Sequence, residues 1–555
     1  MTGTPGSVRA ATLARLSRER FDLVVVGAGA TGAGIARDAV LRGLRVALCD
    51  RGDFAGETSS HSSKLIHGGL RYLQYGDFAL VFEALHERRT LMRTAPHLCW
   101  PLPFLFPAYT GLAPGLTTLG MGIALYNTLA LYRPPVAGRR LSARETLAFS
   151  PGLRAAGLQG AQLYMDCQTD DARLVLETAL DAEAAGAAVA TRLEVTALER
   201  DRRGRVAGAR ARDVLTGEPL TIEARLIVNA TGPYSDVFDH GRRNLRPTLG
   251  VHLLFDAERL PHGGRAHVLR SPRDGRLVFL LPAGARTMVG TTDTDWVAPD
   301  GSSRPPRPGD PVVARGADVR YLLEVANHAF PAAALRPADV VSTFAGLRPL
   351  IATAANSTSA TSREHELRFE QDGLMTVMGG KLTTYRRMAE QAVDLVVERL
   401  RDHGFEGAIG PCLTARRPLP GGGERPSLGE AELAPEVAEH LRRSYGARAR
   451  EVVDLMTAPA AGGVPVEPSA RIDPELPYLW AEVLHAARSE RVLEVDDVLT
   501  RRIPLFRDAR DQGLSAAPLA ADLVAARLGW TKPRRDQSLA RYQARVAASR
   551  AWRQD

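Results

Sequence analysis

The sequence predicts an α/β protein built from a Rossmann-like dinucleotide-binding domain, an inserted and mostly β domain, and a C-terminal helical domain. Three observations predict this class. A β-branched apolar run near residue 23 leads directly into a G-x-G-x-x-G motif, strand-like apolar runs recur between residues 244 and 340, and helical periodicity follows a Pro- and Gly-rich linker at 412–427. With 555 residues the chain is too long for one hydrophobic core, so several domains are expected.

The first element, Leu23 to Val26, is typical of a buried parallel strand. The motif glycines follow it at once: Gly27, Gly29 and Gly32. A helical pattern then runs to Gly43, and a second strand from Arg45 to Cys49 ends at Asp50, close to the separation of about 20 residues expected for a ribose-binding acid. The glycines allow a tight turn, close approach of a pyrophosphate to the helix N-terminus, and close helix–strand packing. An acid rather than an arginine at this position favours FAD or NAD over NADP.

Composition limits the kinds of ligand and metal site that we expect. The net charge of +8 suits an anionic small substrate or an anionic membrane surface, and no Lys/Arg block interleaved with aromatics suggests nucleic acid. The four cysteines lie far apart without a C-x-x-C pair, so we expect a reducing compartment and no metal site. Of the 71 basic residues only three are lysines, which makes each a candidate for a place that needs a compact ammonium group: Lys64, Lys381 and Lys532.

Two segments bear on membrane association. Residues 98–132 carry no charge but contain four prolines, so a buried or surface-lying helix is favoured over a transmembrane one. Residues 1–20 contain arginines and lack the apolar core of a signal peptide. Segments 9–20 and 111–132 are candidates for an amphipathic membrane contact, with ordinary packing as the favoured alternative.

The middle of the chain supplies further turns and helices. A hydroxyl-rich loop at 58–63 could donate to cofactor phosphates, and His67 with two following glycines allows close approach to a flat ring. An amphipathic helix is predicted from Phe78 to Arg93, with its apolar face formed by Phe78, Val81, Phe82, Leu85 and Met92. A strand at Leu226–Val228 ends in an Ala-Thr-Gly turn. Further strands are expected at 252–255, 277–281 and 287–289, and C-terminal helices at 481–488, 495–501 and 519–528.

Several segments resemble the FAD-dependent glycerol-3-phosphate dehydrogenases: GAGATGAGIARDA, SSKLIHGGLRYL, YMDCQTDDARLVL, LIVNATGPYSD, VGTTDTDW, VSTFAGLRPL and MGGKLTTYRRMAE. The resemblance runs from about residue 21 to 400. It implies an FAD-binding domain of the glutathione-reductase/D-amino-acid-oxidase type. We expect this domain at 20–95, 160–240 and 335–405, the substrate domain at 96–159 and 241–334, and the helical domain at 410–545.

The resemblance also implies the activity. The enzyme would oxidise sn-glycerol 3-phosphate to dihydroxyacetone phosphate, with hydride passing to FAD and electrons to a membrane quinone. It would be cytoplasmic and peripheral on the inner face of the cytoplasmic membrane, bound to an anionic surface, and a homodimer is allowed. Neither a calcium-binding loop nor the C-terminal iron–sulfur module of anaerobic relatives is expected.

The implied site residues fall into three groups. The catalytic residues are His67, Arg348 and Lys381, and the substrate-binding residues are Arg71, Tyr72, Arg348, Arg363 and Lys381. The cofactor-binding residues are Gly27, Gly29, Thr31, Gly32, Asp50, Thr58, Ser59, Ser60, Ser63, Lys64, His67, Gly68, Gly232, Gly380, Lys381, Leu382 and Thr383. Arginine forks suit a phosphate, and cations beside a flavin stabilise negative charge that develops during oxidation. His67 is the favoured base, with His252 or water as alternatives.

Three alternatives remain open at this stage. They are an oxidase of the same fold that uses oxygen, a non-catalytic flavoprotein, and an FAD-dependent amine or amino-acid oxidase, which would need one carboxylate-binding arginine rather than several cations. The sequence also departs from the family pattern, because Leu249 stands where relatives usually carry a lysine and His61 lies in a loop where relatives vary. The first departure predicts that one cation near the substrate domain is missing.

Overall fold

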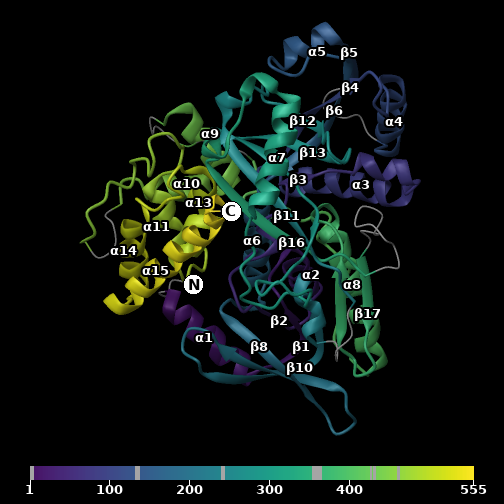
Figure 1. Ribbon diagram of the computed structural model, residues 1–555. Helices are drawn as coiled ribbons and strands as arrows, with labels where there is room; N and C mark the ends of the chain where they lie inside the picture. The colour runs from purple at the N-terminus through teal and green to yellow at the C-terminus, as the bar shows by residue number, and fades with distance from the viewer. Residues whose placement is uncertain are drawn as a thin grey trace.

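The computed structural model describes residues 5–131, 138–238, 244–352, 365–424, 428, 433–458 and 463–554. Figure 1 shows three regions: a sheet with flanking helices at the bottom, a second sheet above it, and a group of helices on the left. This arrangement confirms the predicted fold class, a Rossmann-like α/β domain with a β-rich second domain and a C-terminal helical domain. The domain boundaries given above stay predictions.

The first sheet contains the predicted dinucleotide-binding strands. Its order is β17 (His365–Phe369), β18 (Met375–Gly379), β10 (Pro219–Asn229), β1 (Arg20–Val26), β2 (Val46–Cys49) and β7 (Ala188–Ala190). A side branch adds β9 (Val206–Asp213), which pairs with β10, and β8 (Leu193–Arg200), which pairs with β9. β1 pairs in parallel with both β2 and β10, and its residues 21–26 are buried. A strand buried on both faces reads as a continuous apolar run, which is why this strand is visible in the sequence.

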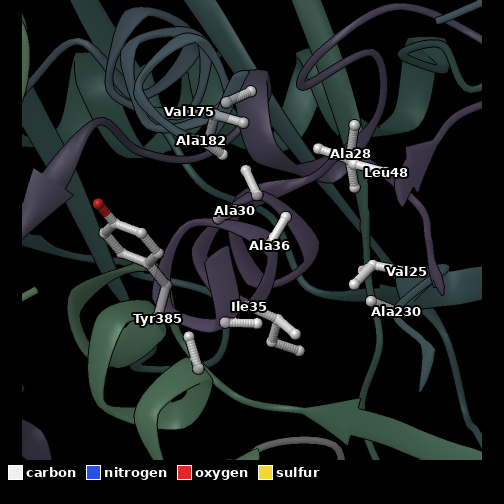
Figure 2. Packing of buried hydrophobic residues seen from close by; sticks show 14 of the residues in the cluster. Val25, Ala28, Ala30, Ile35, Ala36, Leu48, Val175, Ala182, Ala230 and Tyr385 are labelled. Carbon is white, nitrogen blue, oxygen red and sulfur yellow. The ribbon is translucent and has the colours of Figure 1, made fainter. Parts of the chain in front are cut away.

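Three helices cover this sheet around β1: α2 (Ala30–Leu41), α6 (Asp171–Ala184) and α8 (Tyr385–Asp402). Figure 2 shows the small side chains of α2 among residues of β1, α6 and α8, including Val25, Val175 and Tyr385. Gly32 allows α2 to pack closely on the turn after β1, as predicted. A Cβ at this position would lie 1.8 Å from the carbonyl oxygen of Gly27, so no larger residue would fit without a shift of the backbone.

Among the described residues, the second sheet has ten strands. Its order is β15 (Thr294–Asp295), β11 (Thr248–Asp256), β14 (Arg286–Gly290), β13 (Leu277–Ala283), β12 (Ala266–Arg270), β4 (Cys99–Tyr109), β6 (Leu158–Thr169) and β3 (Leu65–Ile66), with β16 (Ser342–Arg348) on β11 and β5 (Arg139–Ser142) on β6. The strands expected at 252–255, 277–281 and 287–289 lie within β11, β13 and β14. A helix that the strand-dominated prediction omitted, α7 (Gly316–Ala329), packs its Val319 and Leu322 into the core of this sheet.

Helices α3 (Phe78–Thr94) and α4 (Leu116–Leu129) flank the second sheet, with α5 (Ala143–Phe149) nearby. The α3 helix ends one residue beyond its predicted range. The helix expected in the uncharged stretch 98–132 is confirmed only for its second half, which forms α4, because residues 99–109 form strand β4 of the second sheet. Within the described ranges, no helix has the length and apolar character needed to cross a membrane. The α1 helix (Pro5–Arg18) buries Leu16 in a core beside β10 and β7.

The C-terminal region is helical. It contains α9 (Pro435–Tyr445), α10 (Ala449–Val453), α11 (Trp480–Ser489), α12 (Val495–Asp497), the π-helical turn η10 (Val498–Arg502), α13 (Leu505–Asp508), α14 (Ala517–Leu528) and α15 (Lys532–Ser549). Beyond α15 the chain returns to the second sheet, where Trp552 is buried in the same core as α7. The Thr343 hydroxyl of β16 donates to the carbonyl oxygen of Ser549 at 3.1 Å.

Candidate functional site

A cavity of about 520 Å³ lies where the predicted nucleotide-binding elements meet. The N-terminus of α2, the loop after β2, the turn after β10 and the turn after β18 all line it. Of the predicted cofactor residues, the following line it: Gly27, Gly29, Thr31, Asp50, Thr58, Ser59, Gly232, Gly380, Lys381 and Leu382. These residues come from four separate segments, so the fold brings together most of the predicted set.

Asp50 directly follows β2 and is partly buried beside the motif glycines. Its two carboxylate oxygens accept hydrogen bonds from the backbone N–H groups of Ala28 and Gly52, both at 2.6 Å. Burial raises the pKa of Asp50, and these two backbone hydrogen bonds act against that rise. The carboxylate is thereby held in one orientation at the edge of the cavity, as a ribose-binding acid requires.

The start of α2 faces the same cavity. Its N-cap residue, Gly29, has no side chain to cap the helix, and the hydroxyl of Ser59 accepts a hydrogen bond from the Ala30 N–H at 3.0 Å. Free N–H groups at a helix N-terminus attract phosphate oxygens. Ser59 belongs to the short helix η1 (Thr58–Ser60), and the Thr58 hydroxyl donates to the carbonyl oxygen of Leu347 at 2.7 Å, which fastens the hydroxyl-rich loop to β16.

Other predicted cofactor residues lie outside the cavity lining. Ser60, Ser63, Lys64, His67, Gly68 and Thr383 belong to this group, as does Gly32, which faces Gly27. Lys64 is buried: its Nζ pairs with Asp171 at the start of α6 and donates to the Ser60 carbonyl oxygen at 3.2 Å. Asp171 also accepts from the hydroxyl of Ser62 at 2.7 Å. Lys64 therefore ties the hydroxyl-rich loop to α6.

Lys381 has different surroundings. It follows β18, lines the cavity, and holds its Nζ 3.7 Å from the ring centroid of Tyr72. Two residues further on, the Thr383 hydroxyl accepts from the His67 N–H at 3.1 Å and donates to the His67 carbonyl oxygen at 3.2 Å. The next residue, Gly68, donates its N–H to the Tyr126 hydroxyl at 2.8 Å. The backbone of His67, the predicted base, is thus fixed beside the turn that follows β18.

Arg348 joins two of the sequence segments that resemble the family. Its guanidinium contacts Asp293 Oδ1 at 3.0 Å, Thr291 Oγ1 at 2.9 Å and the Thr292 carbonyl oxygen at 2.8 Å. Gly250 on the adjacent strand leaves room for it, since a Cβ there would lie 2.6 Å from Arg348 Nη2. Arg348 directly precedes Pro349, which lines the cavity.

Arg71 lies in the short helix η2 (Leu70–Tyr75), and its side chain is not described; Arg363 lies outside the described residues. Leu249 points away from Gly250 and into the core that contains Val251 and Leu347. In this chain, position 249 therefore presents its side chain to the core rather than to the face that carries Arg348.

His252, the alternative base, is buried. Its Nε2 lies 2.9 Å from the Ser63 hydroxyl, and its ring stacks on Phe344 with centroids 4.6 Å apart. Burial lowers the pKa of His252 well below its usual value, and the charge of Arg348 lowers it further. His67 is less buried than His252, which favours His67 for contact with a substrate.

Comparison with known proteins identifies the family. Residues 22–386 match the family model described as FAD dependent oxidoreductase, and residues 412–535 match the C-terminal domain of alpha-glycerophosphate oxidase. Glycerol-3-phosphate dehydrogenase 2 of Mycobacterium tuberculosis is 36% identical over 97% of this chain and 90% of its own length. Aerobic glycerol-3-phosphate dehydrogenase of Staphylococcus aureus is 35% identical over 88% of this chain and 87% of its own length. The chain belongs to the FAD-dependent glycerol-3-phosphate dehydrogenases.

A solved structure of the same family agrees with this assignment. The glycerol-3-phosphate dehydrogenase from Bacillus halodurans, complexed with FAD, has a TM-score of 0.77, 29% identity, and coverage of 98% of both chains. The predicted FAD cofactor is thereby confirmed for the family to which this chain belongs. The cavity fits it, because the α2 N-terminus and the Asp50 carboxylate both line it. Glycines at 27 and 29 let the lining segments pack closely, since a Cβ at Gly27 would lie 2.6 Å from the Ala230 carbonyl oxygen and one at Gly29 would lie 3.0 Å from Ser59 Oγ.

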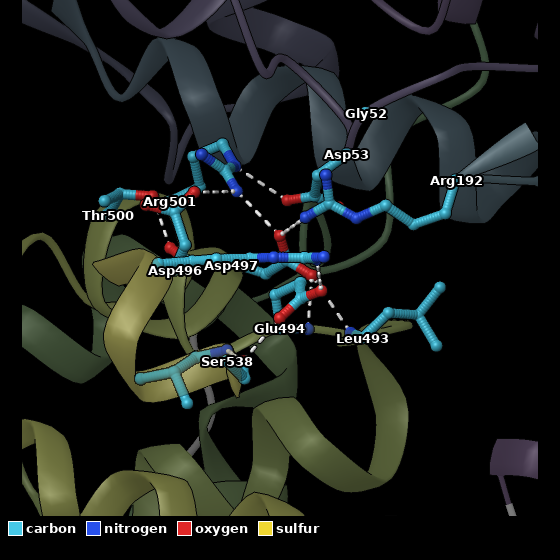
Figure 3. Close-up of polar contacts among 12 residues, drawn as sticks. Gly52, Asp53, Arg192, Leu493, Glu494, Asp496, Asp497, Thr500, Arg501 and Ser538 are labelled. Atoms are coloured by element: carbon cyan, nitrogen blue, oxygen red, sulfur yellow. Dashed lines mark hydrogen bonds and ion pairs between the residues drawn. The ribbon is translucent and has the colours of Figure 1, made fainter. Parts of the chain in front are cut away.

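Sequence reasoning missed one wall of the FAD cavity. Three residues of the C-terminal helical domain line it: Asp496, Arg501 and Arg545. Figure 3 shows the charged network behind them, in which Arg501 Nε contacts Asp53 Oδ2 at 2.7 Å. Arg502 also pairs with Asp53, and Arg192 pairs with Asp497 at 2.5 Å. These contacts join residues more than 300 positions apart, and only the surplus of arginine in the sequence could have hinted at them.

Proposed function

We propose that this family member oxidises the secondary hydroxyl of sn-glycerol 3-phosphate to give dihydroxyacetone phosphate, and that the electrons then pass to a membrane quinone. The observation that carries the proposal is the contact of the cavity residue Lys381 with Tyr72, with Thr383 bonded to the His67 backbone two residues further on. The chain is also 36% identical to a glycerol-3-phosphate dehydrogenase over nearly its full length. Lys381 at the cavity and Arg348 next to the cavity residue Pro349 are two cations that suit a phosphorylated substrate better than an amino acid.

Each group has a part in the reaction. Bound FAD supplies the acceptor for the hydride that leaves C2 of the substrate. His67 takes the proton of the C2 hydroxyl, so that one hydride and one proton leave and the alcohol becomes a ketone. Arg348 and Lys381 bind the phosphate and stabilise the alkoxide charge that develops on the C2 oxygen. Tyr72 fixes the Lys381 ammonium over its ring.

Exposed apolar side chains support contact with the membrane that holds the quinone. Met121 and Leu125 of α4 are 62% and 40% exposed, and Phe78 and Phe82 of α3 are 48% and 40% exposed. The two helices contact each other and lie together at the upper right of Figure 1. A group of exposed apolar residues on a protein of net charge +8 is suited to the surface of an anionic bilayer. The other candidate segment, 9–20, supports this less because its Leu16 is buried.

An anaerobic experiment tests the proposed reaction. Adding sn-glycerol 3-phosphate should bleach the flavin band, and a quinone analogue should restore it faster than oxygen does. Restoration fastest by oxygen, with peroxide formed, would favour the oxidase that the C-terminal family model also suggests. Bound flavin that the substrate does not bleach would refute the proposed substrate.

A sedimentation experiment tests the membrane contact separately. The protein should pellet with anionic liposomes at low salt, and Met121→Glu with Leu125→Glu should weaken this. Leu413→Glu provides the control, because Leu413 is also 40% exposed but lies outside α3 and α4. Equal loss in both variants, or no pelleting of the parent protein, would refute this surface as the contact.

A further inference from the structure

We propose that Arg545, supplied by the C-terminal helical domain, contacts the pyrophosphate of bound FAD, and that Asp496 orients it. The C-terminal domain would then form part of the cofactor site. The predicted cofactor-binding features, by contrast, all precede residue 384: the α2 N-terminus, the hydroxyl-rich loop and the turns that contain Gly232 and Lys381.

Arg545 is placed to reach the cavity. It lies on α15, lines the FAD cavity, and also lines a smaller adjoining pocket with Ser60 and His61. Its Nη1 lies 3.3 Å from Asp496 Oδ2, and its guanidinium lies 5.4 Å from the ring centroid of Phe506. Across the described ranges of the chain, this is the single hydrogen bond or ion pair found for its guanidinium, which carries five N–H donors. Most of its hydrogen-bonding capacity remains available to a ligand.

Arg545 lies close to the loop that faces the α2 N-terminus, because it lines one pocket together with Ser60 and His61. Burial lowers the pKa of His61 to about 3, and the charge of Arg545 is the next cause. Burial raises the pKa of Glu57, and Arg545 is the strongest influence against that rise. Both residues flank Ser59, whose hydroxyl caps the start of α2. A cation at this place would complement a pyrophosphate held at the helix N-terminus.

The contacts of Asp496 hold Arg545 in position. The same oxygen, Asp496 Oδ2, contacts Arg545 at 3.3 Å and Arg501 Nη2 at 3.1 Å. Arg501 in turn contacts Asp53, three residues after the ribose-binding acid. These ion pairs connect the loop after β2, which contains Asp50 and Asp53, to α15. They therefore fix the position of Arg545 relative to the predicted ribose-binding acid. Asp496 is a positioning residue here, since it acts through Arg545.

The test measures cofactor affinity rather than turnover. Full-length apoprotein of Arg545→Gln should bind FAD about tenfold more weakly than the parent, the loss expected for one charge-assisted contact. Arg545→Lys keeps the charge without the planar fork, so its affinity for FAD should lie between those of the parent and Arg545→Gln. The matched control is Arg541→Gln, one helical turn earlier on α15, where the arginine pairs with Glu494 at 2.8 Å. It should bind FAD as the parent does.

Nucleotide fragments separate a phosphate contact from a general loosening of the site. ADP should raise the melting temperature of the parent apoprotein, and Arg545→Gln should lose most of that rise, whereas any rise caused by adenosine should be unchanged. Two results would overturn the proposal. One is an Arg545→Gln variant that binds FAD and ADP as well as Arg541→Gln does, and the other is a variant that loses its response to adenosine and to ADP in the same proportion.

Discussion

Lys64 and Lys381 occupy opposite surroundings, although the sequence marks them in the same way. Both are rare lysines in a chain rich in arginine, and both lie in segments that resemble the family. Lys64 is buried and ion-paired with Asp171, away from the cavity lining. Lys381 lines the cavity with its ammonium over the ring of Tyr72. A rare residue type therefore indicates that a position is constrained, but not whether packing or chemistry constrains it.

The largest expected effect comes from removing the buried lysine. Lys64→Met should lower the free energy of unfolding by about 3–5 kcal/mol, because Asp171 stays buried without its charged partner. Chemical denaturation measures this. The third lysine provides the control, since Lys532 is exposed in the first turn of α15 and Lys532→Met should change stability by less than about 0.5 kcal/mol. Equal stability of the two variants would remove the structural role of Lys64.

Removing the cavity lysine should affect turnover instead. Lys381→Met should lower kcat for sn-glycerol 3-phosphate by roughly 100-fold or more, as is typical when a group that stabilises developing charge is lost. Lys381→Arg should also impair turnover, because a planar fork replaces a compact ammonium over Tyr72. Stopped-flow measurement of flavin bleaching checks both. Wild-type rates in both variants would show that the two lysines do not differ as described.

Acid should lower the free energy of unfolding through His252, a buried histidine whose pKa the charge of Lys64 influences. Burial holds the folded-state pKa of His252 well below 6.5, with smaller contributions from Arg348 and Lys64. The unfolded chain therefore takes up a proton first as pH falls below about 6.5, and stability falls with it by up to about 1.4 kcal/mol per pH unit. His252→Gln should flatten the pH dependence of unfolding between pH 7.5 and 5.5. An unchanged slope would mean that His252 does not titrate in this way.

The smallest expected effect concerns the ring beneath Lys381. Tyr72→Leu should cost about 1 kcal/mol of the interaction that positions the ammonium, and so lower kcat/KM about fivefold. Tyr72→Phe keeps the aromatic face and tests whether the hydroxyl matters as well. If Leu and Phe variants behaved alike, the contact between cation and ring would have no role in turnover.

Local patterns predicted the parts of the fold that local patterns determine. The strand before Gly27, the helix after it and the acid at position 50 lie within 30 residues, and each step has its own steric or hydrogen-bonding reason. The α3 helix was predicted with nearly correct ends, but Phe78 and Phe82 were expected on its apolar face and are exposed. Periodicity identifies a helix without showing which apolar residues its neighbours will cover.

Contacts between distant segments could not be predicted in this way. Arg501 reaches Asp53 across 448 positions, and nothing near either residue distinguishes it from the many other charged residues of the chain. The direction of the Leu249 side chain was also hidden, because it depends on the pairing of β11 with β14 and β16. A strand pattern shows that side chains alternate, whereas the fold decides which face carries the site.

The return of the chain to the second sheet has a consequence for biosynthesis. Trp552 completes a core built mainly by strands and a helix before residue 350, and Ser549 is joined to Thr343 across 206 positions. At synthesis rates of about 5–20 residues per second, that separation corresponds to a delay of roughly 10–40 s. During this interval the nascent second sheet exposes the apolar surface that Trp552 later covers. Chaperones that bind such surfaces during translation would therefore find their target here, well before the ribosome has finished the chain.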